Sequence, residues 1–316
     1  MTSPLVSVVL PVRDGVAFVA DAINSILAQT LHEFELLVVD DGSRDATPAI
    51  IDRLVAQDRR VRLLTQPALG LVPALNRGLE EARSPYVARM DADDVAMPER
   101  LAKQVAVLDA QPLVAAVGGG CRVISREGTP LGHRQPPTDP AEIHQALRQS
   151  NCMIHPTVML RRDIVLRAGG YRAAFRLAED LDLWLRLSER YDLLNLPESL
   201  LDYRQHADQS SWRELEQRAL SELGARALAA RRRLGQLDSA DHVPLITHAF
   251  LREIGVPDAA IARHIISCAL GSAKEAIAAG HHLSARAAIA LLLRQPDLHP
   301  RTRLHAWLLR LRACFA

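Results

Sequence analysis

The chain has 316 residues, and its 38 basic and 37 acidic side chains leave a formal net charge of +1, too small to favour a nucleic-acid partner. A chain of this length can hold one large α/β domain or one domain plus an appendage, and its 48% hydrophobic and 24% charged residues are ordinary for a soluble globular protein. The four cysteines are far apart and form no CxxC pair, so they carry neither a zinc signature nor a disulfide framework. We expect a cytoplasmic protein, because we find no signal-peptide pattern and no run of ~20 apolar residues.

Buried strands and amphipathic helices alternate along the first hundred residues. Apolar, β-branched runs indicate parallel strands covered on both faces. These runs are Val6–Val12, Phe34–Val39, Val61–Leu64 and Tyr86–Ala88. Helical periodicity follows the first three over about 19–27, 47–55 and 70–83, with Thr47 expected as an N-cap and Pro48 as the first helical residue. The pattern predicts an α/β fold with a mostly parallel central sheet flanked by helices.

Polar residues gather where three of the predicted strands end. The strand ends carry Pro11-Val12-Arg13, Asp40-Asp41 and Asp91–Asp94. Because ligands of parallel α/β sheets bind beyond the carboxyl ends of the strands, we expect a binding site on this rim. The turn after the first strand, PVRDGVAF, lacks both the GxGxxG of a dinucleotide site and the glycine-rich basic loop of a sugar-phosphate nucleotidyltransferase.

The stretch YVARMDADDVAMPER places three carboxylates, Asp91, Asp93 and Asp94, within four residues. Such crowding of negative charge is costly without a cation, and a hard divalent ion with oxygen ligands is the natural counter-charge. A solvated acidic turn is the alternative for a DxD considered alone. The other strand ends favour the metal interpretation.

Several motifs occur together in a fixed order. They are VSVVLPVRDG, AINSILAQTLHEFELLVVDDGSRDAT, ALNRGLEEA, YVARMDADDVAMPERL, AGGY followed by AEDLDLWLRL, and DYRQH. In this order they resemble family 2 glycosyltransferases with the Rossmann-like GT-A fold. The resemblance covers about residues 5–206.

The resemblance implies a nucleotide site at the strand ends. Its residues would be Pro11, Val12, Arg13, Asp40, Asp41, Asp91 and Ala92. Within this set Asp41 would accept a hydrogen bond from N3–H of uracil, and Asp91 would face the ribose. Many relatives carry an arginine before the asparagine of the third helix, where this chain has Leu75, and Arg77 is the nearest substitute. The nucleotide therefore stays open, and only Asp41 favours a UDP-sugar.

Mn²⁺ or Mg²⁺ is the implied cofactor, held by Asp93 beside the diphosphate as a Lewis acid. His206, in DYRQHADQSS, is either a further metal ligand or a loop histidine. Asp180, in the AED stretch, corresponds to the family's catalytic base, which implies inversion at the anomeric carbon. The local alternative is that Glu179 and Asp180 only complement the N-terminal dipole of a helix.

Sugar and acceptor contacts are implied for a further group of residues. They are Asp94, His155, Gly170, Tyr171, Glu179 and Trp184. Trp184 would either stack on a sugar face or pack in the core. His155 would either lie near the acceptor or be a core or loop histidine. Arg13 and Arg204 are candidates for phosphate contact from their positions alone.

The last third of the chain is rich in alanine, leucine and arginine and has little strand pattern. We predict a catalytic domain over 1–210 and a helical region over 211–316. The expected helices are 212–234, 240–253, 257–279, 282–294 and 300–313. The last helix places Leu304, Trp307, Leu308, Leu311 and Phe315 on one stripe flanked by arginines. This stripe would either contact an anionic membrane face peripherally or pack against the catalytic domain or a second subunit.

The resemblance thus implies an inverting, metal-dependent hexosyl- or N-acetylhexosaminyltransferase. It would move one sugar from a nucleotide-diphosphate sugar to a glycan or lipid-linked acceptor in cell-surface polysaccharide synthesis. Single transfer is favoured over polymer synthesis, because processive relatives carry membrane helices and a QxxRW motif after the base. Two alternatives stay open: a catalytically idle GT-A scaffold in a glycan-assembly complex, and a sugar-phosphate nucleotidyltransferase.

Overall fold

The computed structural model describes residues 3–206, 214–295 and 298–315. The chain divides into two compact units. The first unit comprises Met1–Arg172 and Leu183–Arg204, and the second comprises Ala173–Asp182 and Gln205–Ala316. The sequence predicted a division at residue 210, and it gave no sign that the short segment Ala173–Asp182 groups with the C-terminal helices.

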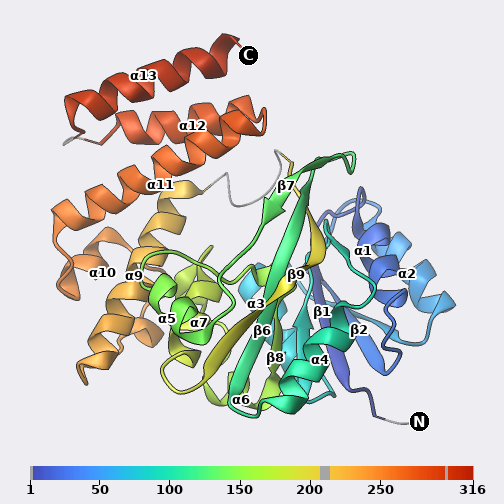
Figure 1. The fold of residues 1–316 in the computed structure, drawn as a ribbon. Helices are drawn as coiled ribbons and strands as arrows, with labels where there is room; N and C mark the ends of the chain where they lie inside the picture. The colour runs from blue at the N-terminus through green and yellow to red at the C-terminus, as the bar shows by residue number, and fades with distance from the viewer. Residues whose placement is uncertain (1–2, 207–213, 296–297, 316) are drawn as a thin grey trace. The chain divides into compact units, whose positions relative to one another are not determined.

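The first unit is built on a mixed nine-stranded sheet (Figure 1). Its strands are β1 (Val6–Val12), β2 (Phe34–Asp40), β3 (Val61–Thr65), β4 (Tyr86–Arg89), β5 (Val95–Ala96), β6 (Val114–Ile124), β7 (Pro130–Arg134), β8 (Met159–Arg161) and β9 (Asp192–Arg204). The main order is β3-β2-β1-β4-β8-β6-β9-β5, and β7 pairs with β6. β1 to β4 are mutually parallel, β8 joins them to β6 in antiparallel pairing, and β6 runs parallel to β9.

Helices lie between these strands. They are α1 (Val19–Leu27), α2 (Thr47–Gln57), α3 (Leu71–Glu81), α4 (Arg100–Ala110), α5 (Pro140–Leu147) and α6 (Arg162–Arg167), with a 3₁₀ turn η1 at His155–Thr157. Helix α7 (Glu179–Leu187) begins in the second unit and ends in the first. The predicted α/β fold is confirmed. One local prediction is wrong: α2 begins at Thr47 itself, with Ala46 at the N-cap position, and the Asp45 carboxylate accepts from Thr47 N at 2.9 Å.

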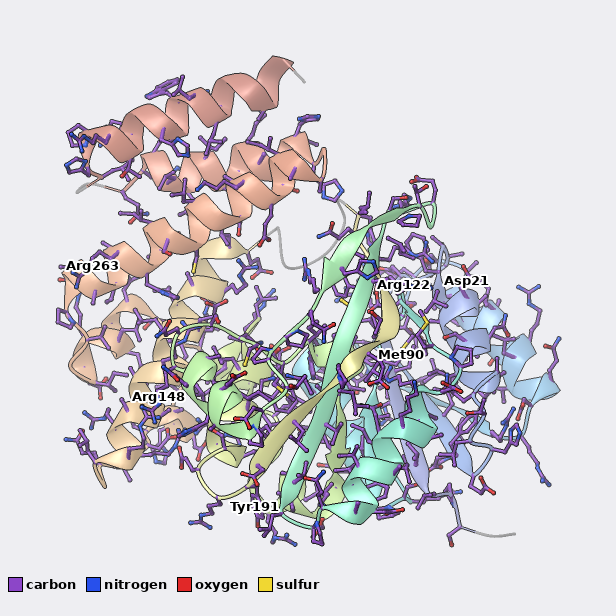
Figure 2. The ribbon with its side chains drawn as sticks, viewed as in Figure 1. Asp21, Met90, Arg122, Arg148, Tyr191 and Arg263 are labelled. Atoms are coloured by element: carbon purple, nitrogen blue, oxygen red, sulfur yellow. The ribbon has the colours of Figure 1, made fainter. Side chains whose placement is uncertain are left out.

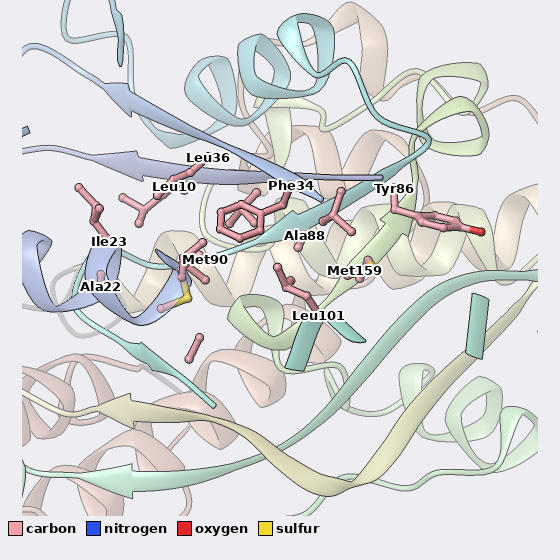
Figure 3. Close-up of a cluster of buried hydrophobic side chains, with 14 of the residues drawn as sticks. Leu10, Ala22, Ile23, Phe34, Leu36, Tyr86, Ala88, Met90, Leu101 and Met159 are labelled. Atoms are coloured by element: carbon pink, nitrogen blue, oxygen red, sulfur yellow. The ribbon is translucent and has the colours of Figure 1, made fainter. Parts of the chain in front are cut away.

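Both faces of the parallel strands are covered. Figure 3 shows Leu10 of β1 and Leu36 of β2 in one cluster with Ile23 of α1 and Leu101 of α4. On the opposite face α3 packs against β1 so closely that a Cβ added at Gly78 would lie 2.3 Å from Val9 Cγ1. Strands buried on both faces need apolar side chains at every position, which explains the continuous apolar runs in the sequence.

The second unit is helical. Its helices are α9 (Leu215–Arg233), α10 (His248–Glu253), α11 (Asp258–Ala278), α12 (His282–Leu293) and α13 (Pro300–Phe315), with 3₁₀ turns η2 at Ala173–Phe175 and η3 at Ala240–His242. Small side chains such as Ala269, Ala273 and Ala288 fill the core between them, and small residues permit close helix packing. Among the described residues, no helix has both the length and the apolar character needed to span a bilayer.

The buried residues of helix α13 differ from those of the predicted apolar stripe. Its buried residues include Ala306 and Leu309, which join the core formed with α11 and α12. Trp307 and Leu308, by contrast, are 49% and 52% exposed. The side chains of Leu304, Leu311 and Phe315 lie outside the described part of the chain. The predicted membrane contact therefore stays a prediction.

Candidate active site

The carboxyl ends of β1 and β2 are joined side by side. The parallel register pairs Val12 with Asp40, and Asp41 N donates to Val12 O at 2.9 Å. Pro11 and Val12 are buried within β1, whereas Arg13 begins the exposed loop, close to Asp14. The structure thus brings the first two predicted strand-end motifs to one rim of the sheet.

Asp40 and Asp41 organise the loops that follow β2. Asp40 Oδ1 accepts from the backbone N and the hydroxyl of Ser43, at 3.1 and 2.5 Å. The buried Asp41 carboxylate accepts from Gln66 Nε2 and Leu69 N at 2.8 Å each, and from Gly70 N at 2.9 Å. Gly70 has a φ of +100°, so glycine suits the turn that starts α3. Asp41 therefore fixes the entrance to α3, and contact with a base would be an additional role.

The third strand end carries the acidic cluster, defined as Asp91, Asp93 and Asp94. One carboxylate oxygen from each residue lies within 4.8 Å of the others. Asp94 is only 1% exposed, and its Oδ1 accepts from Arg204 N at 2.9 Å. Burial raises the pKa of Asp94 well above its usual value, and the carboxylates of Asp91 and Asp93 raise it further. The fold therefore holds these carboxylates together against both desolvation and repulsion.

Two buried arginines lie beside the acidic cluster. Arg89, the last residue of β4, forms an ion pair with Asp91. Burial opposes the charge of Arg89, but the Asp91 carboxylate outweighs it and raises the pKa of the guanidinium. Arg100 is fully buried at the start of α4 and donates from Nη2 to Arg89 O at 2.6 Å. Burial, and then repulsion by Arg89, lower the pKa of Arg100 to about 9.

Arg204, at the end of β9, supports the cluster from the neighbouring strand. Its Nε donates to Asp93 O at 2.8 Å, and its Nη1 donates to Arg126 O at 2.7 Å. The guanidinium also lies over the Phe18 ring, 4.7 Å from its centroid. These contacts make Arg204 a support of the acidic turn. The sequence singled out Arg204 only as a phosphate candidate and did not single out Arg89 or Arg100. The sequence signal that could have identified these residues is the position of each arginine near a strand end or near the DxD.

The acidic cluster suits a divalent cation. Among the described residues, Asp94 Oδ2 is buried without a hydrogen-bond partner. Asp91, Asp93 and Asp94 supply oxygen ligands only, which hard ions such as Mg²⁺ and Mn²⁺ prefer. The guanidinium groups of Arg89 and Arg100 face three carboxylates, and a bound cation would add to this compensation. Ala92 lies between the ligand candidates, partly buried against the core.

Three predicted sugar-contact residues pack on one another. His155 Nε2 lies 2.9 Å from the Tyr171 hydroxyl, and the His155 ring packs edge-on against Trp184 with centroids 5.8 Å apart. Burial, and then the charge of Arg89, lower the pKa of His155 well below its usual value, so the imidazole is neutral at pH 7. Trp184 is 0% exposed, so it packs in the core, the second of its two predicted roles. This burial leaves no indole face on which a sugar could stack.

Gly170 and Tyr171 are fixed by the third helix. Asn76 of α3 donates from Nδ2 to Tyr171 O at 2.8 Å and accepts from Tyr171 N at 2.9 Å. Gly170 has a φ of +65°, and an added Cβ there would lie 2.7 Å from Asn76 Oδ1. Glycine is therefore required at this position for both conformation and space. Arg186 also donates to Gly170 O at 2.6 Å.

Glu179, Asp180 and His206 belong to the second unit. Glu179 is buried and Asp180 is half-buried in the first turn of α7, where Asp180 Oδ1 accepts from Leu181 N at 2.7 Å. His206 is half-buried and follows the end of β9 at Arg204 by two residues. The base role of Asp180 and the ligand role of His206 stay predictions.

A parallel α/β sheet with a carboxylate cluster at the carboxyl ends of its strands is the arrangement of a GT-A glycosyltransferase. The sequence matches the family described as glycosyl transferase family 2 over residues 7–168, just over half of the chain. The chain belongs to this family, as the motifs predicted. It is 35% identical over 208 residues to the O-antigen biosynthesis glycosyltransferase WbnJ of Escherichia coli, a match covering 64% of this chain and 80% of that protein.

Two solved structures share the fold. One is the mannosyltransferase PcManGT from Pyrobaculum calidifontis in complex with GDP-Man and Mn²⁺, with a TM-score of 0.54, 19% identity, and coverage of 99% of this chain and 87% of that one. The other is S. aureus TarS 1–349 in complex with UDP-GlcNAc, with a TM-score of 0.57, 14% identity, and coverage of 92% and 89%. At these identities the likeness shows the fold alone.

Proposed function

We propose that this protein is an inverting, metal-dependent glycosyltransferase that moves one sugar from a nucleotide-diphosphate sugar to a glycan or lipid-linked hydroxyl. The observation that carries the proposal is the acidic cluster, in which a buried Asp94 oxygen has no hydrogen-bond partner among the described residues. The name of WbnJ, a relative that acts in O-antigen biosynthesis, supports a cell-surface polysaccharide as the destination. PcManGT bound to GDP-Man and Mn²⁺ supports a nucleotide sugar and a divalent ion.

Asp93 and Asp94 would hold the Mn²⁺ or Mg²⁺, with His206 as a further candidate ligand. When bound, the ion neutralises charge on the leaving diphosphate. Asp91 would orient the ribose, while Asp41 and the end of β1 would line the base pocket. The Asp41 carboxylate, held by Gly70 N and Leu69 N, supports a UDP-sugar through its acceptor character.

Asp180 would accept the proton of the acceptor hydroxyl. The acceptor oxygen forms a bond to the anomeric carbon while the bond from that carbon to the diphosphate oxygen breaks. A nucleoside diphosphate leaves, and the anomeric configuration inverts. The neutral His155 and the Tyr171 hydroxyl, 2.9 Å apart, would support the acceptor side through uncharged hydrogen bonds.

The test is incubation with a panel of UDP-hexoses, UDP-N-acetylhexosamines and GDP-mannose, with Mn²⁺ and a polyprenyl-diphosphate sugar as acceptor. We expect one donor to release its nucleoside diphosphate and to yield a product whose anomeric configuration, read by NMR, is inverted. Asp180→Asn should lose transfer while still binding the nucleotide. Release of pyrophosphate would identify a nucleotidyltransferase, a retained configuration would overturn the inverting mechanism, and no turnover with any donor would favour a scaffold.

A further inference from the structure

The second unit contains a cluster of three side chains whose chemistry differs from that of the acidic cluster. Glu222 projects from α9, and His264 and Cys268, four residues apart, project from the same side of α11. Figure 2 labels Arg263, which marks the turn of α11 where His264 follows. His264 Nε2 lies 3.5 Å from Glu222 Oε2 and 3.5 Å from Cys268 Sγ, and Cys268 Sγ lies 3.9 Å from Glu222 Oε2.

These separations suit a tetrahedral zinc ion. Zinc bonds of about 2.0 Å to imidazole or carboxylate and about 2.3 Å to thiolate place two tetrahedral ligands roughly 3.3–3.7 Å apart. The observed atoms therefore need to move by only a few tenths of an ångström to share one ion. We propose that Glu222, His264 and Cys268 form a zinc-binding site that links α9 to α11, with a fourth position open to water or another ligand.

The charges around the cluster permit this ion. Arg218 Nε lies 3.6 Å from Glu222 Oε1, and Arg226 Nη2 lies 3.6 Å from Glu222 Oε2. Arg218 is also anchored at Ser272, where its Nη2 donates to the hydroxyl at 3.0 Å. Glu222 would keep its ion pair with Arg218 at Oε1 while Oε2, which also faces Arg226, binds the metal. Because zinc displaces the thiol proton of Cys268, the net charge of the cluster rises by one unit and not by two.

The ligand set separates this site from the acidic cluster. A thiolate and an imidazole favour zinc over Mg²⁺ or Mn²⁺, which prefer the all-oxygen set of Asp91, Asp93 and Asp94. The three ligand residues are each partly exposed, so an ion has a path from solvent. Helices α9 and α11 pack on each other, and a metal bridge between them would stabilise the second unit. This inference is independent of the proposed glycosyl transfer.

Cobalt replaces zinc as a visible probe in the test. Full-length protein carrying Asp93→Asn, which weakens the acidic cluster, is stripped with chelator and titrated with Co²⁺. We expect one equivalent to give intense tetrahedral d–d bands and a thiolate-to-cobalt charge-transfer band. Cys268→Ser should abolish the charge-transfer band and weaken Zn²⁺ binding, measured by chelator competition, at least about 100-fold. Cys152→Ser, which alters another partly buried cysteine, should leave both unchanged.

His264→Gln provides a second variant if the serine substitution impairs folding, and it should weaken Zn²⁺ binding while circular dichroism stays native. A weak octahedral cobalt spectrum, or Zn²⁺ binding that Cys268→Ser and His264→Gln leave unchanged, would overturn the proposal. In that case the cluster would be an ion-pair network of Glu222 with His264 and the two arginines alone.

Discussion

Glu35 and Asp94 are both buried carboxylates of the first unit, but they lie at opposite ends of the strands and have opposite surroundings. Glu35 stands near the start of β2, where it accepts from Ser7 Oγ at 2.7 Å, Arg62 Nη1 at 2.7 Å and Arg83 N at 2.8 Å. Burial opposes its ionisation, but these hydrogen bonds outweigh burial and lower its pKa. Asp94 lies beyond the end of β4 among other carboxylates, and its pKa is raised.

The contrast separates a stabilising carboxylate from a binding one. At the start of the strands each oxygen of Glu35 has a donor, so the charge contributes to folding. At the end of the strands Arg89 pairs with Asp91 and Arg100 lies nearby, but the three carboxylates still repel one another, and a bound cation would relieve that repulsion. Strongly perturbed pKa values cluster at functional sites.

The largest expected effect comes from Asp93→Asn. Removing one ligand charge from the acidic cluster should lower the rate of sugar transfer by roughly 10²–10³-fold, the scale seen when an electrostatic stabiliser of a transition state is lost. The measurement is nucleoside diphosphate release under saturating donor. Asp163→Asn, the same change at an exposed carboxylate of α6, serves as the control and should keep full activity. Equal activity of the two variants would contradict the account.

Arg89→Met should cause the largest loss of stability. Removing the buried guanidinium breaks the ion pair with Asp91, which should cost about 3–5 kcal/mol of unfolding free energy. Urea unfolding at pH 7 measures it. Arg13→Met, at an exposed arginine 4.0 Å from Asp14, should change stability by less than about 1 kcal/mol. Mn²⁺ should restore part of the loss in Arg89→Met, because it supplies positive charge to the same cluster.

Glu35→Gln tests the other end of the sheet. Because the folded pKa of Glu35 lies below 4.5, its ionised form stabilises the fold above that pH, and the stabilisation is lost as the pH falls through the folded pKa. We expect the variant to be about 1–3 kcal/mol less stable at pH 7. The deficit should shrink when urea unfolding is repeated at successively lower pH below 4.5. A deficit independent of pH would assign the effect to packing.

Asp94→Asn should have the smallest effect and the opposite sign. A carboxylate with a raised folded pKa destabilises the fold increasingly as the pH rises through that pKa, so neutralising it removes a cost at pH 7. The metal-free variant should match the wild type or exceed it by about 1–2 kcal/mol. Asn retains an oxygen for Arg204 N. A clear loss of stability in chelator-treated protein would show that Asp94 is compensated in the way Glu35 is.

The sequence predicted most of the parallel half of the fold. Strands such as Val6–Val12 are apolar at every position because both faces are covered, and this pattern is hard to mistake. The antiparallel part was not predicted, because β8 has only three residues and its pairing with β4 and β6 leaves no periodic signal. The cluster of Glu222, His264 and Cys268 was not predicted either, because its side chains come from two helices and only His264 and Cys268 share a helical spacing.

Sequence reasoning singled out the acidic residues of the candidate site, whose ligand roles stay predictions, but it missed the arginines that support them. The DxD and the strand-end aspartates can be read directly, because they follow apolar strand patterns and ligands of parallel sheets bind beyond the carboxyl ends of the strands. Arg89 and Arg100 were missed, since an arginine is ordinarily exposed and its burial depends on partners distant in the fold. Trp184 is buried and packs against the His155 ring. The helical spacing of Trp184 in the sequence could not decide between core packing and contact with a sugar.

We propose that the acidic cluster binds a divalent cation together with a nucleoside diphosphate. The most direct measurement is calorimetric titration of UDP, with GDP and dTDP for comparison, into wild-type protein and Asp93→Asn, each with Mn²⁺ and with EDTA. We expect one nucleotide to bind to the wild type only when Mn²⁺ is present, and we expect that binding to be lost in the variant. Nucleotide binding that is unaffected by EDTA and by Asp93→Asn, or no binding of any nucleotide, would contradict the proposal.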